Sequence, residues 1–184
     1  MTKKDQAASK PCGTERTRKV SGADDELLRA LYAANLPENY AAATLELSRV
    51  MLGAMASYER FAKMHGLTYN ALLVLMLLYH ATPQGGSTQQ TISKSLSLPK
   101  QTVGSILGGF KKKGYTIEKP SPTDARAKAV SLNDEGMEKA ATVFAKLNAA
   151  ETAATLAVDL DDLQTAVKVM RDYADAFEKG MPQS

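Results

Sequence analysis

The sequence predicts a mainly α-helical protein with one small β-hairpin. Apolar residues recur at three- and four-residue steps over most of residues 26–81, 99–114 and 133–177, which is the period of an amphipathic helix. Only residues 115–119 and 127–132, separated by a turn rich in proline, alternate as two paired strands do. The chain of 184 residues suits one domain of ordinary size. We therefore expect residues 26–184 to form a single domain behind a short arm.

Residues 1–25 predict that arm, because they are rich in polar and basic residues and hold almost nothing to bury. A basic tail either contacts nucleic-acid phosphates or only solubilises the chain, and the second interpretation is favoured. Cys12 is the one cysteine, so no intramolecular disulfide is possible, which fits a reducing cytoplasm. A redox sensor would need a thiol held beside groups that lower its pKa. We interpret Cys12 as incidental.

Three helices are expected before residue 82. Residues 26–34 place Leu27, Leu28 and Leu31 on one side of a short helix. Residues 43–64 form a longer amphipathic helix that ends near a glycine. Thr68 is a suitable cap for a helix over 69–81, whose leucine- and methionine-rich centre predicts the central buried helix. The longest apolar run, 71–79, is too short to span a bilayer, so we expect a cytoplasmic protein with no membrane partner.

The segment 69–132 contains the most informative pattern. A loop at 83–87 and a short polar helix to about residue 96 lead through a tight turn to a helix over 99–114. That helix buries a stripe of Val103, Ile106, Leu107 and Phe110. Its other face carries amides, hydroxyls and lysines, and no carboxylate lies between Pro99 and Gly114. Helix, turn, basic helix and hairpin in this order predict a winged helix-turn-helix.

Two further helices follow the hairpin. Asn133 is a cap for a helix to about residue 156, with Leu132 and Met137 placed as a hydrophobic staple. The last helix shows a heptad seam, which either packs within the subunit or meets a partner helix. The helix at 26–34 also lacks an evident partner. We therefore expect residues 26–64 and 133–184 to form a homodimer interface that includes Leu27, Leu28, Leu31, Leu160, Leu163, Val167, Met170 and Phe177.

The formal net charge of +3 is unevenly distributed. Residues 94–132 hold eight Lys or Arg and two acids, net +6, whereas residues 133–184 hold five and ten, net −5. Residues 1–20 carry six basic and two acidic residues, net +4, and residues 21–93 carry four basic and six acidic residues, net −2. The positive charge is concentrated on the helix-turn-helix and hairpin, which favours a polyanionic partner.

Residues 88–136 resemble the DNA-binding core of the multiple-antibiotic-resistance regulator (MarR) family. Three pieces carry the resemblance: residues 98–103, residues 111–115, and the Asp-x-Arg-x-Lys motif at 124–128 followed by residues 131–136. The chain departs from the family pattern at Gly104, Gly108 and Gly109, where larger or polar side chains are common. It also has Asn133 where threonine is usual, and asparagine caps a helix equally well.

The resemblance implies particular roles. In the hairpin, Asp124 would orient Arg126, which would enter a minor groove, with Lys128 on phosphate; the other interpretation of Asp124 is a turn cap. A small effector would bind an apolar pocket that Met51, Met55, Tyr58 and Met76 could line, although methionines at helical spacing are more often core. The DNA-binding residues would be Thr88, Gln89, Lys100, Gln101, Thr102, Ser105, Lys111, Lys112, Asp124, Arg126 and Lys128.

The expected function is that of a sequence-specific regulator of transcription. It would bind double-stranded DNA as a homodimer on a (pseudo)palindromic operator, as a repressor. The alternative is a winged-helix module for protein interaction or assembly that does not read DNA sequence. An enzyme is not expected, because the two histidines, His65 and His80, sit in no metal-ligand spacing and no glycine-rich phosphate loop follows a strand. No cofactor or metal is expected.

Overall fold

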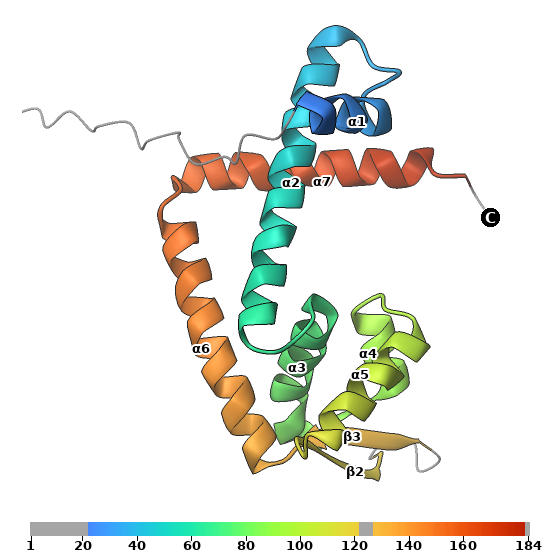
Figure 1. The fold of residues 1–184 in the computed structure, drawn as a ribbon, viewed down its shortest axis with the longest axis vertical. Coiled ribbons are helices and arrows are strands. Elements are labelled where there is room, and N and C mark those ends of the chain that lie inside the picture. Colours follow the sequence, from blue (N-terminus) through green and yellow to red (C-terminus); the bar gives the residue numbers. More distant parts are fainter. Residues whose placement is uncertain (1–21, 122–126, 183–184) are drawn as a thin grey trace, which may run out of the picture. The chain divides into compact units, whose positions relative to one another are not determined.

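The computed structural model describes residues 22–121 and 127–182 of the chain (Figure 1). The described residues divide into two compact units, one up to residue 57 and one from residue 58 onward. The fold is mostly helical with a small antiparallel sheet, as predicted. Among the described residues no single helix is long and apolar enough to cross a membrane, while one bent pair, Glu38–Met64 with Tyr69–Gln84, meets that test of length and composition together.

The first unit contains α1 (Gly22–Tyr32) and the first part of α2 (Glu38–Met64). Both helices begin earlier than the expected starts at residues 26 and 43. Ala33, Ala41 and Leu45 form a small buried core with Leu28 packed against it. The first helix therefore has a partner within the chain, contrary to expectation, although Leu27 and Leu31 remain 60% and 65% exposed.

The core of the second unit is built around α3 (Tyr69–Ala81), which carries Leu72, Val74, Leu75 and Leu78 with almost no exposed surface. The Thr68 hydroxyl caps it by accepting from Ala71 N at 3.2 Å. In Figure 1, α3 (green) lies between α6 (Asp134–Leu156, orange) and the pair α4 and α5. The predicted central buried helix is therefore confirmed.

The helix-turn-helix consists of α4 (Gln89–Ser95) and α5 (Lys100–Lys112). Ser97 takes a positive φ of 51° in the turn between them. Ser93 closes that turn, because its Oγ donates to Leu98 O at 2.6 Å while its carbonyl accepts from Leu98 N at 3.0 Å. After α5 the chain reverses at Gly114, whose φ of 73° is the left-handed conformation that commonly ends a helix.

The sheet has the order β1-β3-β2, all antiparallel. Its strands are β1 (Ser87–Thr88), β2 (Thr116–Pro120) and β3 (Lys128–Leu132). The predicted hairpin is β2 and β3. The sequence predicts a loop at 83–87 followed by a polar helix, and it does not predict β1 or the short 3-10 helix η1 (Thr82–Gln84). A strand of two residues is too short to show an alternating pattern.

The sheet leads into α6 and then α7 (Leu160–Gly180). Asn133 joins α6 to the base of the hairpin: its Oδ1 accepts from Gly136 N at 2.9 Å, and its Nδ2 donates to Gly114 O at 2.6 Å. Leu132 is buried, and Met137 packs on the same core, as the staple predicts. In α7 no residue is buried.

Candidate nucleic-acid interface

One face of α5 is buried and the opposite face is open. Val103 and Phe110 are almost fully buried, Leu107 is buried at the same side, and Ile106 packs partly against them. Helical spacing then turns the polar residues outward. Lys100, Gln101, Ser105, Lys111 and Lys112 are exposed, and Thr102 is partly exposed. The predicted division of this helix is therefore confirmed.

Thr88 and Gln89 have structural partners at the start of α4. The Thr88 hydroxyl caps the helix by accepting from Thr91 N at 3.1 Å. The Gln89 amide crosses to the next helix, where Nε2 donates to Lys100 O at 2.7 Å. This bond joins the two helices of the motif at the point where α5 begins. Both residues thus help to set the geometry of the helix-turn-helix.

Gly104 leaves room for the Gln89 amide. A Cβ at this position would lie 2.8 Å from Gln89 Nε2, closer than real Cβ contacts come. Gly108, one turn further along α5, has nothing within 4 Å of such a Cβ. The two glycines line a hollow of about 250 Å³ between α5 and the hairpin, together with Leu107 and Val130. The departure from the family pattern therefore has a structural reason at Gly104 and leaves open space at Gly108.

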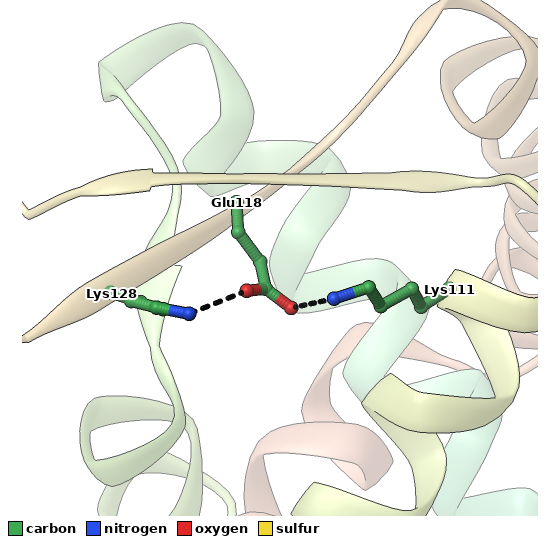
Figure 2. Close-up of polar contacts among 3 residues, drawn as sticks. All are labelled: Lys111, Glu118 and Lys128. Atoms are coloured by element: carbon green, nitrogen blue, oxygen red, sulfur yellow. Dashed lines mark hydrogen bonds and ion pairs between the residues drawn. The ribbon is translucent and has the colours of Figure 1, made fainter.

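Glu118 lines this hollow, and its carboxylate lies between two lysines (Figure 2). Its Oε1 accepts from Lys111 Nζ of α5 at 2.9 Å, and its Oε2 pairs with Lys128 Nζ of β3 at 3.4 Å. Hydrogen bonds from Lys111 and then Lys128 hold the pKa of Glu118 below its ordinary value. The carboxylate is therefore charged at neutral pH and links the hairpin to α5.

Sequence reasoning did not single out Glu118. The charge pattern does set this residue apart, because Glu118 is the first acidic residue after Glu59 and the charged residues between them are all basic. Lys100 and Lys112, by comparison, form no ion pair with any residue that the structure describes. Lys113 donates to Gly66 O at 3.4 Å.

The hairpin tip lies outside the described residues, and with it Asp124 and Arg126. Just before and just after the tip the chain is joined by a hydrogen bond, since Ser121 N donates to Ala127 O at 2.9 Å. Lys128 is exposed at the start of β3.

The residues expected to form a dimer interface or a ligand pocket are placed as follows. Leu160, Val167 and Phe177 on α7 are 49–64% exposed, and Leu163 and Met170 are partly exposed. In the first unit, Met51 and Met55 are exposed. In the second unit, Met76 packs on the core and the Tyr58 hydroxyl donates to Glu151 Oε1 at 2.7 Å.

The hydrogen bond from Tyr58 to Glu151 is the main reason why the pKa of Tyr58 is raised, and burial is the second reason.

In the described part of the chain, no three His, Cys, Asp or Glu side chains lie close enough together to hold a metal ion.

A cationic helix behind a tight turn, with a β-hairpin beside it, defines a winged helix-turn-helix protein. Residues 65–127 match the model of the MarR family. The resemblance predicted from the sequence is therefore confirmed over these residues, which make up about a third of the chain. No curated protein matches the sequence.

Solved structures share the fold. CouR from Rhodococcus jostii RHA1, solved with p-coumaroyl-CoA, is 19% identical with a TM-score of 0.58, over 76% of this chain and 94% of CouR. MepR from S. aureus, solved as a complex with DNA, is 18% identical with a TM-score of 0.60, over 70% of this chain and 96% of MepR. The regulator MarR from Oenococcus oeni PSU-1 is 16% identical with a TM-score of 0.56, over 71% of this chain and 97% of that protein.

Proposed function

We propose that this protein is a transcription regulator that binds double-stranded DNA with α5 in the major groove and the hairpin against the backbone and minor groove. The observation that carries the proposal is the two-sided character of α5. Its apolar side is fixed in the core through Val103 and Phe110, so the helix has one orientation and presents amides, hydroxyls and ammonium groups outward. These are the groups that contact phosphates and base edges.

The charge of the surrounding elements supports DNA as the partner. Together α4, α5, β2 and β3 contain six lysines and one carboxylate, Glu118. The centre of a protein-binding face is normally depleted in lysine. A duplex, by contrast, presents a phosphate charge every ~1.7 Å along its axis, which a row of ammonium groups neutralises.

For the residues that the structure describes, the proposed roles follow the position of each side chain. Lys100, Lys111 and Lys112 contact phosphates, whereas Gln101, Thr102 and Ser105, in the first half of α5, face base edges. Thr88 and Gln89, at the start of α4, contact the backbone while holding the motif together. In the hairpin, Lys128 contacts phosphate, and by the resemblance to the family Asp124 would orient Arg126 toward a minor groove. The MepR structure, which shares the fold, is that of a DNA complex.

We propose further that the protein acts as a homodimer and represses transcription from a (pseudo)palindromic operator. The exposed apolar residues of α7, with Leu27 and Leu31 of α1, would be covered in a dimer. Two-fold symmetry would place two α5 helices on successive turns of one duplex face, which is why the operator would be palindromic.

A small-molecule effector is a further part of the proposal. CouR, which shares the fold, was solved bound to p-coumaroyl-CoA. Of the four residues predicted from the sequence for an effector pocket, Tyr58 and Met76 belong to the second unit, and we assign these two to an effector site. Binding there would be read as a loss of operator affinity on addition of the ligand.

The second candidate function is a protein-interaction or assembly module without sequence-specific reading. Gly104, Gly108 and Gly109 favour it, because they remove three side chains from α5. The two functions are separated by titrating a fluorescent mixed-sequence duplex at several salt concentrations. DNA binding predicts that affinity falls steeply and linearly on a log–log plot as salt rises. No binding at about 50 mM salt, where non-specific contacts are strong, would contradict the regulator and leave the module.

A further inference from the structure

Glu118 is the one carboxylate in the four elements that form the proposed DNA-facing surface. It reaches two of the lysines assigned to phosphate, Lys111 on α5 and Lys128 on β3, and all three side chains line the hollow. Figure 2 shows the carboxylate between the two ammonium groups, with one oxygen directed toward each. The two lysines come from different elements, and this one side chain joins them.

A carboxylate and a DNA phosphodiester have the same recognition chemistry here. Both are anions that present two oxygens to ammonium donors. Two ammonium groups that converge on the oxygens of Glu118 are therefore also arranged to hold the two non-bridging oxygens of a phosphate. An acid in this place occupies the position that the partner's charge would take.

We propose that the Glu118 carboxylate occupies a DNA phosphate site formed by Lys111 and Lys128, and that it competes with the duplex for both lysines. The inference rests on the proposed function, since it requires this surface to meet DNA. Glu118 then lowers the affinity for any duplex and makes it less salt-dependent, because two cations are partly neutralised before DNA arrives. Sequence preference, which depends on base contacts, is unaffected.

The exposure of the three side chains allows the exchange. Lys111 and Lys128 are 64% and 77% exposed and Glu118 is 33% exposed, so both ammonium groups are open to an incoming strand. Ion pairs at such positions contribute little to stability because water and salt screen them. Breaking them on DNA binding is therefore easy, and removing the carboxylate leaves the fold intact.

The test is duplex affinity as a function of salt for the full chain and for Glu118→Gln. The amide keeps the size of the side chain and removes its charge. We expect the slope of log affinity against log salt to steepen by about one unit, as for one more neutralised phosphate. With the affinity extrapolated to about 1 M salt unchanged, this corresponds to about eightfold tighter binding at about 0.1 M.

Three variants separate local competition from net charge. Glu138→Gln removes an exposed carboxylate of α6, outside the four elements, and should leave the slope nearly unchanged. In a Lys111→Ala, Lys128→Ala background, Glu118→Gln should give no gain, because the site is gone. In a Lys112→Ala background the full gain should remain, since Lys112 forms no ion pair with Glu118.

The outcomes are distinct. Weaker or unchanged binding by Glu118→Gln, with a wild-type thermal melt, would overturn the inference while leaving DNA binding in place. An equal gain from Glu118→Gln and Glu138→Gln, or a gain that persists without Lys111 and Lys128, would also overturn it. Failure of the wild-type chain to bind any duplex would remove the proposed function, and the inference with it.

Discussion

Gly136 has no room for a larger side chain at the start of α6. A Cβ there would overlap the backbone carbonyl of Tyr115, which cannot rotate away as the end of a long side chain could. The carbonyl is fixed because it also accepts from Asn133 N at 3.1 Å. The first turn of α6 therefore rests directly on the base of the hairpin.

Gly136→Ala should accordingly destabilise the protein by about 1–3 kcal/mol, the usual cost of overpacking. The matched control is Gly108→Ala on α5, where nothing lies within 4 Å of the added carbon. This change should stabilise by about 0.5–1 kcal/mol because alanine loses less backbone entropy in a helix than glycine. Urea unfolding measures both changes. Equal changes in the free energy of unfolding for the two variants would show that the contact with Tyr115 does not determine the cost at Gly136.

The effects on stability of substitutions at Gln89 and Gly104 should be coupled, because the Gln89 amide that bonds to Lys100 O lies beside Gly104. Gln89→Ala removes the bond to Lys100 O and should cost about 0.5–1.5 kcal/mol. Gly104→Ala displaces the same amide, but the gain in helix propensity offsets the loss, so the net change should lie within about 1 kcal/mol of zero. Unfolding of the two single variants and the double variant measures the coupling. If Gln89→Ala cost the same in the Gly104→Ala background as in the wild-type chain, the two sites would be independent.

At the scale of elements, α5 separates two kinds of contact. Lys112→Ala should weaken every duplex alike and reduce the salt slope by about one, because Lys112 is assigned to phosphate. Gln101→Ala should flatten the preference between a selected site and a scrambled site, because Gln101 is assigned to a base edge. Competition binding with both duplexes at one salt concentration tests the pair. A Lys112 variant that changed site preference while keeping its non-specific affinity would contradict the assignment.

The elements also show what sequence patterns carry. The stripe through Val103, Leu107 and Phe110 was predictable because a helix repeats its period over thirteen residues. The capped ends at Thr68 and Asn133 were predictable because capping depends on local residue type. The strand Ser87–Thr88 was not, since its pairing partners Val130 and Ala129 lie more than forty residues away and two residues show no period.

The candidate site was only partly predictable for the same reason. The exposed face of α5 follows from spacing alone. The bond from Gln89 to Lys100 and the place of Glu118 between two lysines depend on how α4, α5 and the hairpin fold together. A pattern within one element cannot show a contact between elements. The sequence alone also does not explain why a glycine stands at position 104. In the structure, the Gln89 amide takes the space that a larger side chain there would need.

At the scale of the whole molecule, the exposed apolar residues of α7 predict a second copy of the chain. Leu163→Glu with Met170→Glu places two charges in the heptad seam and should convert dimer to monomer or unfolded protein. The control is Thr165→Glu with Lys179→Glu, two exposed positions outside the seam of the same heptad pattern. Sedimentation with circular dichroism measures both. An unaltered dimer after the seam change would mean that the interface lies elsewhere.

The central claim is that α5 and the hairpin read a DNA sequence. The most direct measurement is selection of bound duplexes from a random pool by the full chain, followed by titration of the enriched duplex at fixed salt. The account predicts enrichment of one (pseudo)palindromic motif, bound by two chains per duplex, with half-sites about one helical turn apart. Recovery of a random pool with no enriched motif, or one chain per duplex on a motif without symmetry, would contradict it.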